Sequence, residues 1–263
     1  MLQPMFLEEI GDDGVAWLTL TRPEVHNAFN DTLIGELTAV LTGLGTDERV
    51  RAVVLSAQGR SFSAGADLNW MQRTAKFSKE ENLTDARALA RLMRTLNGLA
   101  KPTLVLVQGP AIGGGVGLIA CCDIAIAAET AKFSLSEVRL GLIPAVISPY
   151  VIAAMGQRAA RRYFLTGELF TADEALRLGL VHKVVPDEAL HDVGKRTITA
   201  LLAGGPNAQV AAKELIFEVA GRPLDDNLVE HTAQRIAHLR VSNEAQEGIS
   251  AFLEKRKPRW VKS

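Results

Sequence analysis

The chain has 263 residues, which is long for one domain and short for two. Apolar residues make up 48% of the chain and charged residues 22%, and the net charge is −1, so nothing in the composition favours binding to nucleic acid or to an anionic membrane. No apolar run reaches the roughly 18 residues of a membrane-spanning helix. We therefore expect one main globular domain with an appendage.

The termini and the cysteines suggest where the protein works. The first residues have neither a basic region nor an apolar core, so no secretory signal is expected. The two cysteines, Cys121 and Cys122, are adjacent in an apolar run, and we expect them to be reduced and buried in a cytoplasmic protein. Because no His or Cys lies at ligand spacing from them, no metal site is predicted.

Strands and one helix are predicted in the first part of the chain. A Gly-Asp-Asp-Gly turn joins the first two apolar segments, which indicates a hairpin. Either Asn30 or Asp31 can cap the helix that follows. The elements expected here are strands at 6–10, 15–21 and 50–57 and a helix that ends near residue 44.

A small, glycine-containing segment, SFSAGADLNWM, spans residues 61–71 and follows the third strand. Backbone N–H groups can be left free in such a segment. Asp67 within it is a possible catalytic carboxylate, although a helix cap is the favoured interpretation. Ser78 and Glu81 then have the spacing of a capping box, which predicts a helix up to residue 100.

Glycine dominates the segment that follows a predicted strand at 103–107. Gly113, Gly114 and Gly115 precede an apolar run with the length of a short buried helix. Glycine lets the backbone approach a ligand closely, and a helix start offers free N–H groups and a partial positive charge. The segment therefore predicts a site for a negatively charged oxygen, with close strand–helix packing as the alternative.

One carboxylate, Glu137, lies downstream in the apolar segment SLSEVRLGLIPA. An enzyme that forms an enolate needs backbone donors at the developing oxyanion and a group that moves a proton. Glu137 can supply the second of these. The alternative is a surface carboxylate paired with Arg139, and Asp123, at the start of a strand, is expected to make structural hydrogen bonds.

Helices dominate the last part of the chain. A short strand is expected at 182–185, and only helices after residue 187. Residues 204–206 mark a boundary between a strand-containing body, 1–205, and a helical region, 206–263. The alternation of strands and helices in the body favours an α/β fold with mainly parallel pairing. A helical region that cannot cover itself suggests a homo-oligomer.

Five segments occur in a fixed order along nearly the whole chain: TRPEVHNAFN, SFSAGAD, VQGPAIGGGVGLIACCDIAIA, SEVRLGLIPA and FLEKRKP. In this order they resemble the crotonase superfamily, which includes enoyl-CoA hydratases and isomerases. The resemblance implies a spiral of ββα units with a C-terminal all-helical oligomerisation region, assembled as a homotrimer or a dimer of trimers. It also implies an acyl-CoA thioester as substrate and no cofactor, since CoA is part of that substrate.

The same resemblance implies roles for particular residues. The backbone N–H groups of Ala66 and Gly114 would hold the thioester oxygen, and Glu137 would be the acid/base. The basic residues 255–257 would approach the CoA phosphates. Contacts with the CoA part of the substrate would come from Arg22, Val25, Ser63, Ala64 and Leu68.

The chain departs from the family pattern at Gly117, where typical hydratases carry a first glutamate. Standard water addition uses two carboxylates, one to hold the water and one to exchange the proton at C2. SAGADLNWMQ, GLIACCD and SEVRLGLIPAVISPYV resemble bacterial hydratases of the methylglutaconyl-CoA type, from leucine and related isoprenoid breakdown, whose substrates carry their own carboxylate. We hypothesise that this carboxylate helps to hold the water and is oriented by Arg139 or Arg73.

Three functions are therefore open. The favoured one is a lyase that adds water to a branched, carboxylated 2-enoyl-CoA. The second is an isomerase that moves an enoyl-CoA double bond with the single glutamate. The third is a non-catalytic acyl-CoA or RNA-binding protein, an idea that rests on Lys, Arg and Trp interleaved in the C-terminal tail, although no nucleic-acid or membrane partner is expected from the charge.

Overall fold

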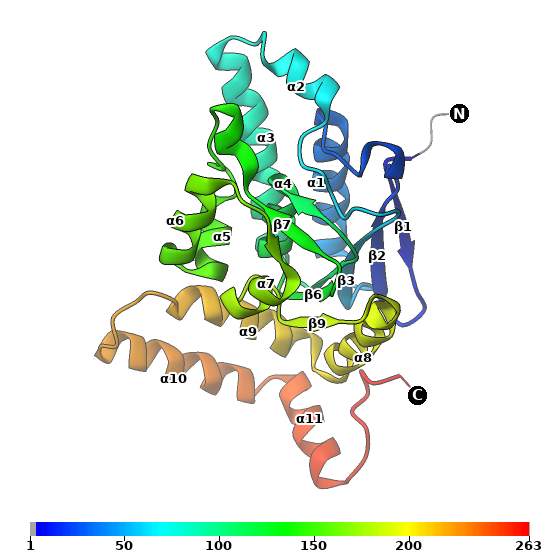
Figure 1. The fold of residues 1–263 in the computed structure, drawn as a ribbon. Coiled ribbons are helices and arrows are strands. Elements are labelled where there is room, and N and C mark those ends of the chain that lie inside the picture. Colours follow the sequence, from blue (N-terminus) through cyan, green and yellow to red (C-terminus); the bar gives the residue numbers. More distant parts are fainter. Residues whose placement is uncertain (1–3, 263) are drawn as a thin grey trace.

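The structure, a computed structural model, describes residues 4–262 and contains two sheets (Figure 1). The larger sheet has the order β1-β2-β3-β4-β6-β9, in which β1 is antiparallel to β2 and all other neighbours are parallel. Its strands are β1 (Phe6–Ile10), β2 (Val15–Leu20), β3 (Ala52–Ala57), β4 (Thr103–Val107), β6 (Ile124–Ala128) and β9 (Lys183–Val185). The mainly parallel α/β body expected from the sequence is confirmed.

The smaller sheet joins segments that are far apart in sequence. Its strands are β5 (Ala111–Ile112), β7 (Lys132–Ser134) and β8 (Phe170–Thr171), with β5 parallel and β8 antiparallel to β7. Isolated bridges connect Ser63 with Ala111 and Phe29 with Ala66. The two glycine-containing loops are thereby held next to each other.

Helices cover both faces of the larger sheet and continue beyond it. Three short 3-10 helices are η1 (Pro23–Val25), η2 (Ser136–Leu140) and η3 (Asp187–Ala189). The α-helices are α1 (Asp31–Thr46), α2 (Leu68–Thr74), α3 (Lys79–Asn97), α4 (Gly114–Cys121), α5 (Ser148–Met155), α6 (Gln157–Thr166), α7 (Ala172–Leu178), α8 (Leu190–Ala203), α9 (Pro206–Val219), α10 (Asp226–Arg240) and α11 (Asn243–Leu253).

Caps explain where two of the long helices begin. The Asn30 side chain accepts a hydrogen bond from the backbone N–H of Leu33, so Asn30, and not Asp31, caps α1. At α3 the Ser78 side chain accepts from the N–H of Glu81, and the Glu81 side chain accepts from the N–H of Ser78. The predicted capping box is confirmed.

The core lies on both faces of the larger sheet. The strand β4 is fully buried along its length, as expected for a central strand in a parallel sheet. On one face the sheet packs against α1, α3 and α4, and on the other against α8. The first core includes Leu18, Val53, Leu55, Val105, Leu37, Leu41, Leu92 and Leu118, and the second includes Val54, Leu104, Leu106, Ile126, Leu190, Val193 and Ile198.

In Figure 1, α10 and α11 lie away from the strands toward the lower edge of the view, and α9 lies between them and the body. Within the described chain α9 has no buried residue, and α10 and α11 bury only Leu228 and Ala251. An ion pair of 2.8 Å between Lys213 and Asp123 ties α9 to the body. Large apolar side chains remain exposed on this region: Ile216, Phe217, Val229, Ile236, Phe252 and Leu253.

Candidate active site

The loop that carries Ala66 and the loop that carries Gly114 are joined by backbone hydrogen bonds. The N–H of Ile112 donates to the carbonyl of Ser63 at 2.9 Å, and the N–H of Phe62 donates to Pro110 at 3.0 Å. On the other side of the first loop, the N–H of Phe29 donates to the Gly65 carbonyl at 2.6 Å. These bonds hold the two loops in a fixed relation.

Two backbone N–H groups at this junction are free to bind a ligand. Gly114 is the first residue of α4, where the N–H has no partner within the helix. The Ala66 N–H is flanked by bonded neighbours, since the Asp67 N–H donates to Phe29 and the Gly65 N–H to the Ser63 hydroxyl. Within residues 4–262, neither the Ala66 nor the Gly114 N–H has an acceptor. Free backbone N–H groups can bind a negatively charged oxygen.

The glycines at the start of α4 allow close packing and leave the backbone accessible to a ligand. Gly113 has φ +51°, and a Cβ there would lie 2.9 Å from Oε1 of Glu137. A Cβ on Gly114 would lie 2.6 Å from the Phe29 ring. Side chains are thus excluded at both positions, and the carboxylate of Glu137 stands directly beside the start of α4.

Glu137 lies in η2, which follows the small strand β7, and its side chain is partly buried. Its Oε2 atom is buried and has no hydrogen-bond partner in the described part of the chain. Burial raises the pKa of this carboxyl above its usual range. A carboxyl that is unpaired, beside free N–H groups and easier to protonate can exchange a proton with a bound substrate.

The alternative considered for Glu137, a surface ion pair with Arg139, is not observed in the described chain. No ion pair between the two occurs among residues 4–262, and Arg139 lies at the exposed end of η2. Arg73, the other arginine expected to orient a substrate carboxylate, forms an ion pair of 2.8 Å with Asp31. Of these two guanidinium groups, that of Arg139 is the one without an ion pair in the described chain.

The residues expected to contact CoA differ in how accessible they are. Leu68 is 75% exposed and Ala64 is also exposed, whereas Val25 is partly buried. Ser63 is fully buried and its hydroxyl donates to the Asn27 carbonyl, so its side chain does not face solvent. The Arg22 guanidinium binds Asp67 and the Ala28 carbonyl within the chain.

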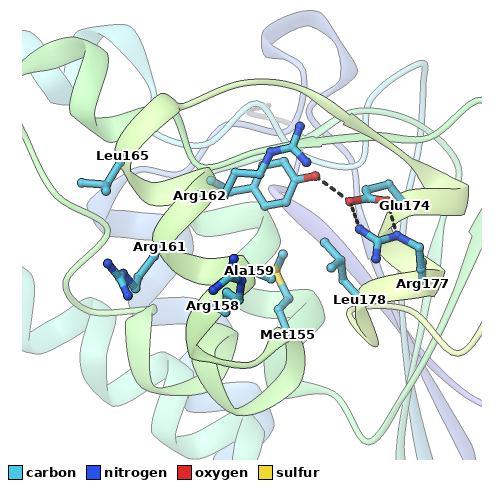
Figure 2. Close-up of a pocket in the computed structure, with 10 residues that line it drawn as sticks. Met155, Arg158, Ala159, Arg161, Arg162, Leu165, Glu174, Arg177 and Leu178 are labelled. Atoms are coloured by element: carbon cyan, nitrogen blue, oxygen red, sulfur yellow. Dashed lines mark hydrogen bonds and ion pairs between the residues drawn. The ribbon is translucent and has the colours of Figure 1, made fainter.

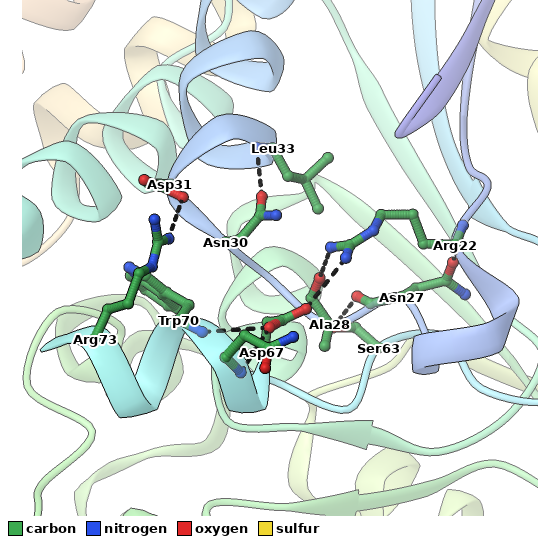
Figure 3. Close-up of polar contacts among 11 residues, drawn as sticks. Arg22, Asn27, Ala28, Asn30, Asp31, Leu33, Ser63, Asp67, Trp70 and Arg73 are labelled. Carbon is green, nitrogen blue, oxygen red and sulfur yellow. Dashed lines mark hydrogen bonds and ion pairs between the residues drawn. The ribbon is translucent and has the colours of Figure 1, made fainter. Parts of the chain in front are cut away.

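Arg22 and Asp67 form a buried structural pair (Figure 3). The Arg22 guanidinium lies 3.1 Å from Asp67 and also donates to the Ala28 carbonyl at 2.9 Å. Asp67 caps α2 by accepting from the N–H groups of Asn69 and Trp70, which confirms the structural interpretation of this carboxylate. The pair fixes the segment that leads from Ala66 into α2.

Asp123 and Arg256 both make polar contacts within the chain. Asp123 accepts hydrogen bonds from the backbone and side chain of Thr103 and pairs with Lys213, as expected of a structural carboxylate. In the basic tail, Arg256 forms ion pairs with Glu247 at 2.6 Å and with Glu254 at 2.7 Å. Its guanidinium is therefore already neutralised within the chain.

A separate pocket of about 650 Å³ lies between α6 and α7 (Figure 2). Arginines line it, but Arg162 pairs with Glu168, and Glu174 accepts from both Arg177 and the Tyr163 hydroxyl. None of the residues expected at the catalytic site lines this pocket. Its size therefore does not make it the site of the chemistry.

Residues 4–262 contain neither a cluster of metal ligands nor a membrane-spanning helix. No group of three or more His, Cys, Asp or Glu side chains in that part of the chain could hold a metal ion. None of its helices is both long and apolar enough to cross a membrane. Cys121 and Cys122 are free and buried, and burial raises the pKa of both thiols.

Comparisons with known proteins agree with the geometry. The family model described as enoyl-CoA hydratase/isomerase matches residues 11–263. A crystal structure of an enoyl-CoA hydratase from Shewanella pealeana superposes with a TM-score of 0.94 at 49% identity, covering 98% of this chain and 96% of that one.

Two relatives with named activities are also similar over nearly their whole length. The 2,3-dehydroadipyl-CoA hydratase of Escherichia coli is 34% identical over 245 residues, which cover 93% of this chain and 94% of the relative. The trans-2-decenoyl-[acyl-carrier-protein] isomerase of Streptococcus mutans is 31% identical over 254 residues, which cover 95% of each chain. Hydration and double-bond movement therefore both occur among proteins of this fold.

Proposed function

Because the chain belongs to the enoyl-CoA hydratase/isomerase family, we propose that it adds water to a branched 2-enoyl-CoA that carries its own distal carboxylate, as methylglutaconyl-CoA does. The protein is an enzyme with enoyl-CoA hydratase/isomerase-type activity. The observation that supports the finer proposal is the carboxylate of Glu137 beside the start of α4, together with the lack of a side chain at Gly117.

In the proposed mechanism the two loops and Glu137 act together to add water to the double bond. The N–H groups of Ala66 and Gly114 bind the thioester oxygen and stabilise the enolate that forms when the water oxygen bonds to C3; donors of this kind contribute about 3–4 kcal/mol each. Glu137 accepts a proton from the water and delivers a proton to C2. The addition is redox-neutral, so the reaction needs no cofactor beyond the CoA of the substrate.

The second role of a hydratase carboxylate, holding the water, is assigned in this proposal to the substrate. Gly117 on α4 provides no side chain for it. Arg139, exposed and without an ion-pair partner among residues 4–262, can orient a distal substrate carboxylate by a charge-assisted hydrogen bond. The Escherichia coli relative is named a 2,3-dehydroadipyl-CoA hydratase, and the acyl group in that name is dicarboxylic. This supports a substrate that carries its own carboxylate.

The second candidate function is movement of a double bond with Glu137 carrying a proton between two carbons. The single carboxylate and the isomerase relative favour it. RNA binding has less support, because Arg256 in the basic tail is neutralised by Glu247 and Glu254.

The proposal also covers the oligomeric state, the cellular location and the pathway of the enzyme. The exposed apolar side chains of α9 to α11 support assembly into a homotrimer or a dimer of trimers. The free, buried cysteines support a cytoplasmic location. A carboxylated, branched substrate supports a place in the breakdown of leucine or related compounds.

The test is a comparison of two substrates with the purified protein. Loss of the conjugated enoyl thioester is followed for 3-methylglutaconyl-CoA and for crotonyl-CoA, and the products are identified by mass. The proposal expects a gain of one water with a preference of at least about 100-fold in kcat/KM, or about 2.7 kcal/mol, for the carboxylated substrate. Equal turnover of the two substrates contradicts the role of the substrate carboxylate, and interconversion of 2-enoyl and 3-enoyl isomers without a mass change favours the isomerase.

A further inference from the structure

The space above Gly117 is filled by another part of the chain. Gly117 is buried in α4, one helical turn after Gly113, whose own Cβ direction meets Glu137 at 2.9 Å. A Cβ on Gly117 would overlap Cγ2 of Ile147, lie 2.9 Å from Ile147 Cβ and 3.3 Å from Met93 Cε. Any side chain at position 117 would therefore need the volume that Ile147 now occupies.

Ile147 is held in this place by its surroundings. It is 3% exposed, and its carbonyl accepts hydrogen bonds from the N–H groups of Tyr150 and Val151 at the start of α5. Its branched Cβ leaves few alternative rotamers. Met93, on α3, is fully buried behind it. The hydrogen bonds fix the backbone of Ile147, and burial restricts its side chain.

We propose that Ile147, supported by Met93, is a specificity-determining residue of this enzyme. Ile147 takes the volume into which a side chain at position 117 of α4 would extend, so an apolar wall stands where typical hydratases carry their first glutamate. Water cannot be held by a protein carboxylate at that wall, so turnover depends on a substrate that brings its own. This inference rests on the proposed hydration, and it names the contact that sets the substrate class.

The overlap between a side chain at position 117 and Ile147 is tested by protein stability, without any assay of activity. Replacing an ordinary helical glycine by alanine raises stability. Gly117→Ala is expected instead to lower the melting temperature by about 5 °C, because overpacking a core is destabilising. Ile147→Gly is the matching change, since Ile147→Ala would keep the Cβ contact. In the Ile147→Gly background, Gly117→Ala is expected to cause no further loss.

A Gly117→Ala variant as stable as the wild type would overturn the proposed wall. So would a loss of the same size in the Ile147→Gly background. Either result is available even if the protein hydrates none of the substrates offered.

The catalytic part is tested by rebuilding the missing acid. The double variant Gly117→Glu/Ile147→Gly is expected to hydrate crotonyl-CoA with a kcat/KM at least 10-fold above that of the wild type. Gly117→Glu alone and Gly117→Gln/Ile147→Gly are expected to show no gain, because the first lacks room and the second lacks a carboxylate. The inference is overturned if the double variant folds and hydrates crotonyl-CoA no better than the glutamine control.

The experiments distinguish a wrong role for Ile147 from a wrong assignment of hydration to the enzyme. A wild type that hydrates 3-methylglutaconyl-CoA while the rebuilt variant gains nothing on crotonyl-CoA rejects Ile147 as the determinant. A wild type inactive on both substrates rejects the proposed hydration, and the melting temperatures still decide whether Ile147 fills the space.

Discussion

Glu137 combines burial with an unpartnered carboxylate oxygen, a combination that is unfavourable in a folded protein. Its side chain is partly buried, and its Oε2 atom has no hydrogen-bond partner among residues 4–262. A buried, unpaired carboxylate is costly, and such groups are retained where a reaction uses them. The residue can therefore be probed both by its contribution to turnover and by its effect on stability.

Removing the ionisable group of Glu137 is expected to abolish proton transfer. In Glu137→Gln, kcat should fall by about 10²–10⁴-fold, the usual contribution of general acid–base catalysis, while KM changes little. Steady-state rates with the preferred enoyl-CoA measure this effect. Glu36→Gln, at an exposed position of α1, is the matched control and should keep full activity.

Glu137→Gln is also expected to be more stable than the wild type at pH 7. Because burial raises the folded-state pKa of Glu137, folding favours the protonated carboxyl. The wild type therefore loses stability as pH rises from the unfolded-state pKa through the folded-state pKa, and the amide does not. Melting temperatures measured from pH 4 to pH 7 should separate with rising pH, and a constant gap would show that burial of the charge is not the cause.

At the scale of elements, cap residues and apolar runs predicted several of the helices. The helix α1 and the capping box of α3 follow from local sequence, because a cap involves residues only three apart. The strands β5, β7 and β8 were not predicted, since elements of two or three residues show no periodicity. The 3-10 helix that carries Glu137 was missed for the same reason.

The site was predictable only in part, for a related physical reason. The glycines and Glu137 signal their role through residue type, whereas the space they share depends on contacts between distant segments. Ile147 packs against Gly117 across 30 residues of sequence, and nothing local to either residue indicates that contact. The ion pair of Arg22 with Asp67 likewise depends on tertiary structure.

The cap of α1 gives a prediction at this scale. Asn30→Ala removes the acceptor for the Leu33 N–H and should lower the free energy of unfolding by about 1 kcal/mol, because one helix-terminal donor is left without a partner. Chemical denaturation measures this loss. Asn30→Asp keeps an acceptor at the same position and should remain within a few tenths of a kcal/mol of the wild type. Equal losses in both variants would mean that the hydrogen bond is not what stabilises the helix start.

At the scale of the whole molecule, the body and the C-terminal helices differ in how they bury apolar surface. The body has cores on both faces of its larger sheet, whereas α9 has no buried residue in the described chain. Exposed apolar surface of this extent is typical of an interface with another protein. A second copy of the same chain is the occupant expected from the symmetry of most soluble oligomers.

The resulting prediction concerns mass and its dependence on one side chain. Phe252 on α11 is 81% exposed, and we expect it to be covered by a neighbouring subunit in an assembly of three or six chains of 28.3 kDa. Light scattering of the eluting protein at micromolar concentration should give three or six times the monomer mass.

Phe252→Glu places a charge in that interface and should shift the protein toward monomers, because an unpaired charge is costly to desolvate. Asn227→Glu adds the same charge at an exposed polar position of α10 and should leave the mass unchanged. A monomeric wild type would reject the assembly, and a Phe252→Glu protein that keeps the oligomeric mass would place the interface elsewhere on the helical region.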